Sequence, residues 1–237
     1  MGIDYVALDI ETTGLNPRKD QILEIGAAKV ADGEIIETYA VFVDSKIKIP
    51  EFITKLTGID NAMVAGGASP NEAVTGLIEF CKEAPILGHN ILFDYSFIKR
   101  NATNQGRHFD NYGIDTLTIA KKFLAELPKR NLESLCKHYK IKQEKKHRAY
   151  EDAISASRLY HHLRQEFYQV SPAAFDPKEL IYQVKKENVI TDAQKRYLND
   201  LLKYHKIEID ISIESLTKNE ASRIIDGIIL KHGRIVR

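Results

Sequence analysis

The amino-terminal part of the chain alternates between short apolar runs and turn signals, a pattern typical of a β-sheet. Residues 3–10, 21–30 and 35–43 are rich in Ile, Leu, Val and Ala, and each run has the length of a strand. Asp32-Gly33, between the second and third runs, is a two-residue hairpin signal. We therefore expect the chain to open with three antiparallel strands.

Further along the chain, apolar positions recur with a helical period, and two short apolar runs interrupt them. The clearest helix start is Ser69-Pro70 with Glu72, a capping box with proline in the first turn. The expected helices cover residues 50–56, 69–81, 90–98, 116–123, 132–139 and 149–167, and the expected short strands cover 85–88 and 112–115. This order predicts an α/β fold, in which a mixed sheet is flanked by helices.

Two prolines and few regular-structure signals mark residues 171–177 as a linker. They would divide the chain into a main domain of residues 1–170 and a small module of residues 178–237. In this module, capping boxes at Thr191 and Thr217 predict two helices, and alternating isoleucines between them have a strand-like period. We expect a small α/β or helical appendage that either docks a substrate or partner or supports the main domain.

Composition fits a folded protein. Hydrophobic residues make up 43% and charged residues 28%. The net charge of +1 does not by itself indicate a nucleic-acid partner, although a local groove could still be basic. Cys81 and Cys136 lack metal-type spacing and lie in apolar helical patterns, so we expect buried thiols in a reducing cytoplasm. No apolar run predicts a signal peptide or a membrane span. A cytoplasmic protein without membrane contact is therefore expected.

Carboxylates interrupt the apolar pattern at three places. Asp9 and Glu11 are two residues apart on a predicted strand, so both side chains project from the same face. Asp94 lies one helical turn after Asn90, where a strand meets a helix. Asp152 opens the long helix at residues 149–167. Paired anions repel each other unless a cation or a proton separates them, so the pair on the strand suggests either a cation site or a solvent-exposed strand end.

His147 precedes Asp152 by five residues, which correspond to a rotation of roughly 140° on a regular helix. The two side chains can converge only if His147 lies in the loop before the helix and Asp152 in the first turns. The small residue Ala149 keeps that approach narrow. The basic run Lys142–Arg148 around this histidine is either a solvated loop or a contact for phosphates.

Three stretches together resemble the motifs of the DEDDh (DnaQ-like) 3′→5′ exonucleases. They are Asp9-Ile-Glu11-Thr-Thr-Gly, His89-Asn90-x-x-Phe93-Asp94 and His147-x-Ala149-x-x-Asp152. Within this family the likeness is strongest to the proofreading exonuclease domain of Gram-positive type DNA polymerase III and to the epsilon subunit, and it covers about residues 1–168. Position 148 is arginine, whereas the tyrosine variant of the superfamily would need tyrosine there. The histidine type is therefore indicated.

The resemblance implies a ribonuclease H-like fold and two divalent ions, Mg²⁺ or Mn²⁺. Asp9, Glu11, Asp94 and Asp152 would hold the metals, and His147 would be the general base. Six residues would contact the terminal nucleotide, namely Thr12, Thr13, Leu15, His89, Asn90 and Phe93. Simpler roles stay open for three of them, because Asn90 could only cap a helix, His89 could only make local hydrogen bonds and Phe93 could belong to the core.

The implied function is a metal-dependent 3′→5′ exonuclease that releases nucleoside 5′-monophosphates, in proofreading or repair. Its partners would be single-stranded DNA or RNA 3′ ends, and a DNA polymerase is a further candidate. The alternative is a non-catalytic module that binds nucleic-acid ends or a polymerase. The complete set of four acids and one histidine favours the enzyme, because binding alone needs no such set. The sequence leaves open whether DNA or RNA is preferred.

Overall fold

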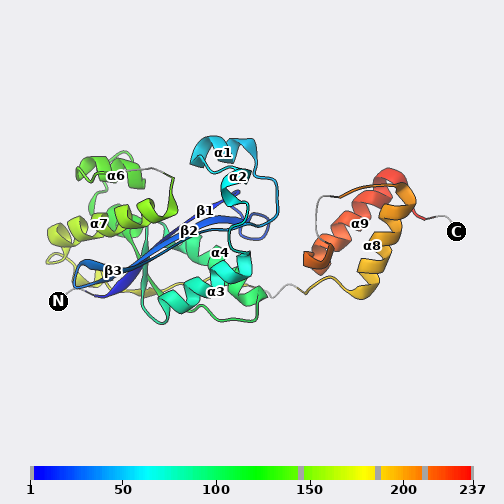
Figure 1. Ribbon diagram of the computed structural model, residues 1–237. Coiled ribbons are helices and arrows are strands. Elements are labelled where there is room, and N and C mark those ends of the chain that lie inside the picture. Colours follow the sequence, from blue (N-terminus) through cyan, green and yellow to red (C-terminus); the bar gives the residue numbers. More distant parts are fainter. Residues whose placement is uncertain (1–2, 144–146, 185–187, 210–212, 236–237) are drawn as a thin grey trace. The chain divides into compact units, whose positions relative to one another are not determined.

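The chain folds into two compact units, Met1–Val184 and Lys185–Arg237 (Figure 1). The structure, a computed structural model, describes residues 3–143, 147–184, 188–209 and 213–235. In these parts of the chain, no helix is both long and apolar enough to span a bilayer.

A six-stranded mixed sheet forms the centre of the first unit. The strands are β1 (Tyr5–Thr12), β2 (Ile22–Ala31), β3 (Glu34–Phe42), β4 (Ile86–Gly88), β5 (Tyr112–Asp115) and β6 (Lys178–Glu179), in the order β3-β2-β1-β4-β5-β6. The first three strands are antiparallel, and β1, β4 and β5 run parallel. The predicted mixed α/β sheet with an antiparallel opening is therefore confirmed.

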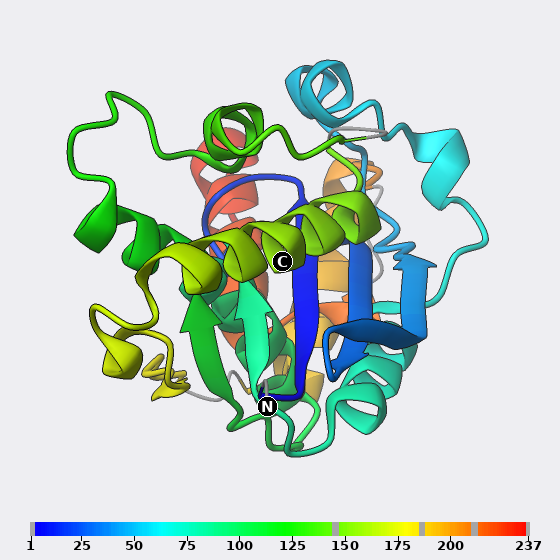
Figure 2. The same cartoon turned by 90° about the vertical axis from the view of Figure 1, so that its left-hand side faces the viewer.

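Helices cover both faces of this sheet, as Figure 2 shows for the long helix that crosses one face. The helices of the first unit are α1 (Glu51–Thr57), α2 (Asn61–Val64), α3 (Pro70–Cys81), α4 (Ile91–Asn104), α5 (Thr116–Phe123), α6 (Leu132–His138) and α7 (Ala149–Phe167). One hydrophobic core lies between the sheet and α3 and α4, and a second lies between the sheet and α5, α6 and α7.

Strand β1 sends alternate side chains into these two cores. The α3–α4 core receives Val6, Leu8 and Ile10, and the α7 core receives Tyr5 and Ala7. Because the alternation continues along the strand, Asp9 and Glu11 lie on the α7 side of the sheet. The two carboxylates thus extend the face that α7 covers.

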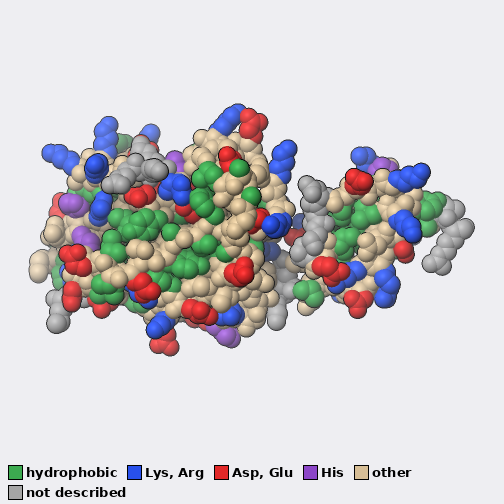
Figure 3. Space-filling model, viewed as in Figure 1, with side chains coloured by type: hydrophobic (Ala, Val, Ile, Leu, Met, Phe, Trp, Pro, Cys, Tyr) green, Lys and Arg blue, Asp and Glu red, His purple; other side chains and the backbone are tan. Residues whose placement is uncertain are grey.

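The two edges of the sheet differ. At one edge the short strand β6 pairs antiparallel with β5. At the other edge β3 is half-exposed and shows Ile35 and Ile36 to solvent. Figure 3 shows apolar side chains along the region of β3 and β2, with acidic side chains beside them.

The expected linker at residues 171–177 needs correction, because it packs on the first unit. Phe175 is buried in the α7 core, where its ring contacts Tyr160 and Phe123. The chain then continues into β6, and the division between the units falls after Val184. The prolines had indicated an interruption of regular structure, which is present, but an apolar side chain still anchors the segment.

The second unit is built on the helices α8 (Asp192–His205) and α9 (Lys218–His232). Both begin with the predicted capping boxes, at Thr191 and Thr217. The strand-like isoleucine period between them forms no strand where the structure describes it, since a 3₁₀ turn covers Ile213–Ser215 and Ile211 lies outside the described residues. Ile207 and Ile213 instead pack against the core of the helix pair, which explains their apolar character.

Candidate active site

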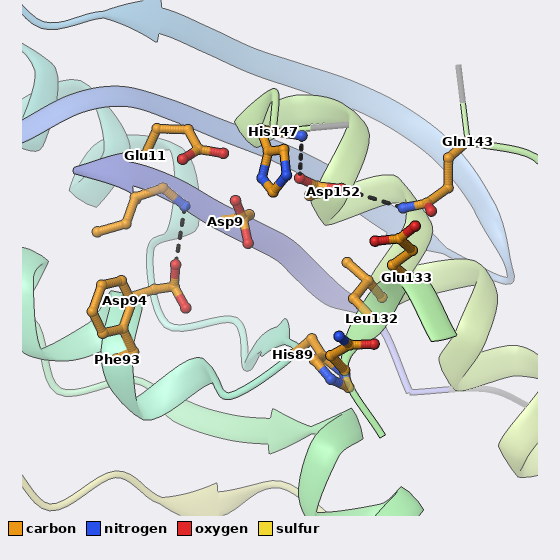
Figure 4. Close-up of a pocket in the computed structure, with 12 residues that line it drawn as sticks. Asp9, Glu11, His89, Phe93, Asp94, Leu132, Glu133, Gln143, His147 and Asp152 are labelled. Carbon is orange, nitrogen blue, oxygen red and sulfur yellow. Dashed lines mark hydrogen bonds between the residues drawn. The ribbon is translucent and has the colours of Figure 1, made fainter. Parts of the chain in front are cut away.

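Four carboxylates and one histidine from three separate parts of the chain border one pocket (Figure 4). Asp9 and Glu11 come from the end of β1, Asp94 from the first turn of α4, and Asp152 from the first turn of α7. His147 lies in the loop that precedes α7. The structure therefore brings together all five residues expected to carry the chemistry.

The pocket has a volume of about 300 Å³ and an acidic wall facing a more apolar one. Its lining consists of Asp9, Ile10, Glu11, His89, Phe93, Asp94, Asn131, Leu132, Glu133, Gln143, His147 and Asp152. This volume is of the order of a single nucleotide.

Asp94 is buried and also holds the neighbouring strand. Its Oδ1 accepts a hydrogen bond of 3.0 Å from the backbone N–H of Ile10, as Figure 4 shows. This bond fixes the first turn of α4 against β1 between the two β1 carboxylates. Burial, with a smaller contribution from Glu11, raises the pKa of Asp94 to about 8.

His147 and Asp152 meet as the sequence spacing predicts. The backbone N–H of His147 donates a hydrogen bond of 3.0 Å to Asp152 Oδ2, and His147 has a left-handed backbone with a φ of 56°. Glu11, His147 and Asp152 each offer one ligand atom, and these atoms lie within 4.8 Å of one another. Gln143 Nε2 lies 3.4 Å from the other oxygen of Asp152.

The proximity of these acids strongly perturbs their protonation. Burial, followed by the charges of Asp94 and Glu11, raises the pKa of Asp9 well above its ordinary value. Burial and the neighbouring Asp152 raise the pKa of Glu11 to about 8, and burial raises the pKa of Asp152. Carboxylate oxygens are the donors that Mg²⁺ prefers, and a divalent cation would relieve this repulsion. The donor set therefore fits divalent metal.

Three expected substrate contacts from the first motif do not line the pocket. Thr12 Oγ1 donates a hydrogen bond to the carbonyl of Gly14 at 2.6 Å, and Thr13 Oγ1 accepts one from the N–H of Gln21 at 2.9 Å. Both hydroxyls thus hold the loop after β1. Leu15 is 84% exposed at the surface of this loop. Their proposed contact with the terminal nucleotide would require a substrate that extends beyond the pocket.

On the second motif, the structure places His89 and Phe93 at the pocket but not Asn90. His89 Nδ1 lies 2.9 Å from Thr116 Oγ1, and His89 Nε2 lies 2.9 Å from the carbonyl of Arg130. Both ring nitrogens are therefore occupied, which favours a local hydrogen-bonding role for His89. Asn90 stands at the N-cap position of α4, yet its side chain makes no capping hydrogen bond. Its left-handed φ of 72° is a conformation that asparagine tolerates better than most residues.

Besides Ile10, which lies between Asp9 and Glu11, four pocket residues were not expected from the sequence to belong to the site. Asn131, Leu132 and Glu133 form the start of α6, and Gln143 lies in the loop after it. Asn131 caps α6 by accepting the N–H of Ser134, and the helical pattern expected at residues 132–139 gave no indication that this helix reaches the carboxylates. Residues 144–146 of the basic run lie outside the described residues, and Arg148 at its end binds Glu24 instead of facing the pocket.

The fold and the acidic pocket have counterparts among known exonucleases. A family model described as RNase_T, Exonuclease, matches residues 6–160, and the chain belongs to this exonuclease family. Among its relatives is DNA polymerase III subunit epsilon of Aquifex aeolicus, 30% identical over 69% of this chain and 82% of that protein. DNA polymerase III PolC-type of Clostridium perfringens is 39% identical over 66% of this chain, which spans only 11% of the PolC-type protein.

Solved structures show the same fold at low sequence identity. Escherichia coli exonuclease I in complex with a dT13 oligonucleotide matches with a TM-score of 0.63 and 18% identity, over 71% of this chain and 42% of that one. Exonuclease X in complex with 5′ overhanging duplex DNA matches with a TM-score of 0.56 and 22% identity, over 68% of this chain and 92% of that one.

Proposed function

We propose that the chain is a metal-dependent 3′→5′ exonuclease that removes single nucleotides from DNA ends as nucleoside 5′-monophosphates. The observation that carries this proposal is the convergence of four carboxylates and His147 on one pocket the size of a nucleotide. Membership of the exonuclease family supports hydrolysis of nucleic acid, and the names of its relatives favour DNA. A module that only binds nucleic-acid ends would not need carboxylates that repel one another.

Each acidic residue has a distinct task in this proposal. Asp9, Glu11, Asp94 and Asp152 would hold two divalent ions, which supply charge neutralisation and activation of water when bound. Asp9 lies among Glu11, Asp94 and Asp152, so its carboxylate would help to hold the ions (Figure 4). Asp94 accepts the N–H of Ile10, and this bond holds its carboxylate at a fixed position relative to Asp9 and Glu11 on β1.

His147 is the proposed general base. A neutral imidazole has a ring nitrogen that accepts protons, so His147 would take the proton of the attacking water and release it to solvent. The side chain is exposed at the pocket mouth, where a proton can leave. Asp152 fixes the backbone of His147 by accepting its N–H, so the ring projects over the acidic wall.

The opposite wall would receive the terminal nucleotide. Phe93 and Leu132 offer apolar surface for the base or sugar, and Asn131 and Glu133 offer polar groups beside it. The pocket leaves room for a single unpaired nucleotide, so the substrate would be a single strand or a frayed 3′ end. Action on mismatched ends in the company of a DNA polymerase follows from the likeness to DNA polymerase III proteins.

The test is cleavage of 5′-labelled single strands of matched DNA and RNA sequence, with Mg²⁺ or Mn²⁺ and with chelator. We expect a ladder of progressively shortened DNA, release of deoxynucleoside 5′-monophosphates and no reaction with chelator. Asp9→Asn should reduce the rate at least about 10³-fold, because a metal bound in the transition state contributes several kcal/mol. Glu126→Gln, an exposed carboxylate outside the pocket, is the control and should act like wild type. Internal cuts, or products carrying 3′-phosphates, would contradict the proposal.

A further inference from the structure

A buried carboxylate that the proposed reaction does not use lies directly beside the site. Glu24 on β2 is paired in register with Glu11 on β1, and it is only 3% exposed. Residues paired across antiparallel strands point to the same face, so Glu24 lies on the α7 side of the sheet next to the catalytic acids. Such a buried charge needs a partner.

Arg148 is that partner. Its Nε lies 3.2 and 3.1 Å from the two carboxylate oxygens of Glu24, and its second terminal nitrogen lies 2.8 Å from Oε1. The guanidinium carbon also lies 4.9 Å from the centre of the Phe42 ring. A two-pronged hydrogen bond combined with contact to an aromatic ring defines the orientation of a guanidinium closely.

The same carboxylate holds the backbone at the start of α7. The N–H of Ala149 donates to Glu24 Oε2 at 3.3 Å, and Arg148 itself, the N-cap residue, provides no side-chain cap. Gly26, two residues along β2, allows the helix to approach, because a Cβ there would lie 2.0 Å from the backbone nitrogen of Tyr150. The first turn of α7 therefore rests directly on β2.

We propose that Glu24 and Arg148 form a clamp that positions the His147 imidazole for the reaction. The clamp holds Arg148 and the N–H of Ala149, the two residues directly after His147, and so constrains the backbone from which the His147 ring projects. Asp152 lies one helical turn after Arg148, and its carboxylate accepts a hydrogen bond from the N–H of His147. Position 148, which carries a tyrosine in related enzymes of another type, is here turned away from the pocket to serve as an anchor.

A role in stability alone would leave a different signature. A buried ion pair adds little net stability compared with a well-packed apolar pair, so the value of the clamp lies in its geometry. If the clamp acts through His147, a defect in it should slow turnover only while His147 is present. If it only supports the fold, its loss should lower the melting temperature and affect turnover equally with and without His147.

The test rests on the proposed function and uses Arg148→Lys, which keeps the charge but loses the two-pronged geometry. We expect kcat to fall about 10-fold or more, with KM and the half-saturating Mg²⁺ concentration changed less than about two-fold. His147→Ala alone should lower kcat by about 10². In the His147→Ala background, Arg148→Lys should lower kcat less than about two-fold further. An unchanged kcat, or an equal loss in both backgrounds, would overturn the clamp.

A second measurement needs neither metal nor activity. In protein labelled at histidine, the His147 ring resonance is identified by its loss in His147→Ala, and Arg148→Lys should shift or broaden it. Arg107→Lys is the matched control, because Arg107 pairs with Glu79 on the surface, and it should leave that resonance unchanged. If Arg148→Lys does not fold, Glu24→Gln, which keeps an acceptor for Ala149, replaces it in both measurements.

The two proposals fail in different ways. An unmoved His147 resonance in a folded clamp variant overturns the clamp, whatever the wild-type protein cleaves. A shifted resonance in a protein without nuclease activity upholds the clamp as a structural device and rejects the proposed function. Lowered turnover that depends on His147, together with a shifted resonance, supports both.

Discussion

Individual carboxylates in this site combine a structural contact with a proposed chemical task. Asp94 is a proposed metal ligand, and it also accepts the backbone N–H of Ile10, which joins α4 to β1. Asp152 likewise serves the pocket and fixes the loop at His147. Replacing either residue would therefore change both the donor set and the local backbone. Asp9 has no protein hydrogen bond of this kind among the described contacts, and it is the better position for removing the charge alone.

The raised pKa values of these acids make stability depend on pH and on metal. Glu11 titrates at about 8 in the folded chain, against 4.5 for an ordinary glutamate. Between these values the folded state binds a proton that the unfolded state lacks, so stability should decrease as pH rises from about 4.5 to about 8. Below this range Glu11 is protonated in both the folded and the unfolded state, and its ionisation no longer lowers the stability of the fold.

Thermal melts in chelator and in Mg²⁺ across this pH range measure the effect. In chelator the melting temperature should fall towards pH 8, and Mg²⁺ should raise it most at that pH because it binds the ionised carboxylates. Asp9→Asn should melt several degrees higher than wild type in chelator and gain less from Mg²⁺. A melting temperature that is independent of Mg²⁺ at pH 8 would contradict this expectation.

A residue's position in the site could be predicted from the sequence only where local geometry limited how its side chain could point. His147 and Asp152 are five residues apart at a helix start, so helix geometry alone limited how they could meet. Thr12 and Thr13 were different, because a hydroxyl that faces a ligand and one that holds its own loop look alike in a sequence. Their bonds to Gly14 and Gln21 depend on the path of the loop, which no local pattern specifies.

Among the elements, the start of α7 is the one that positions the site. Its register against β2 depends on the missing side chain of Gly26, since a Cβ there would lie 2.0 Å from Tyr150 N and 2.3 Å from the carbonyl carbon of Ala149. Both neighbours are backbone atoms, which cannot rotate away as a side chain could. The position of His147 therefore depends on a residue without chemical function.

Gly26→Ala should lower the free energy of unfolding by about 1–3 kcal/mol, the usual cost of overpacking, and should reduce nuclease activity by displacing α7. Denaturant unfolding and the oligonucleotide assay provide the two measurements. Gly227→Ala is the matched control, because a Cβ added at this position inside helix α9 would have no neighbour within 4 Å among the described residues. There alanine should be neutral or stabilise the chain. Equal behaviour of the two variants would show that α7 does not rest on β2 as described.

Elements with strong end signals were predictable, whereas their long-range contacts were not. The capping boxes located α3, α8 and α9. That α6 brings Leu132 and Glu133 to the carboxylates follows from its packing on α7, a contact between segments with unrelated local patterns. The two-residue strand β6 was missed because Lys178 and Glu179 carry no strand signal and pair only through their backbone.

At the scale of the molecule, the chain consists of a unit that contains the whole pocket and a smaller helical unit. The boundary after Val184 assigns Phe175 and β6 to the first unit, although the sequence suggested a linker there. Each unit has a hydrophobic core of its own, which is the usual condition for independent folding. The proposed chemistry therefore needs only the first unit.

Two truncations separate these assignments. A chain ending at Val184 should unfold cooperatively and cleave short oligonucleotides at the wild-type rate. A chain ending at Ser171 loses Phe175 and the β6 pairing and should be about 3–5 kcal/mol less stable, comparable to removing a buried phenylalanine. Unfolding curves and the cleavage assay measure both. Equal stability of the two truncated chains would contradict the assignment of residues 172–184 to the first unit.

The unequal edges of the sheet bear on how the protein avoids self-association. An uncovered outer strand is a template on which another chain can add its own strand. β6 blocks this at β5, whereas β3 has no such cover in the described structure. A register shift in the pairing of β2 with β3 at Lys29 and Val30 interrupts the regular ladder there, and Glu34 and Glu37 add carboxylates to β3. Strand-to-strand aggregation is thereby opposed by charge and irregularity, even though Ile35 and Ile36 face the solvent.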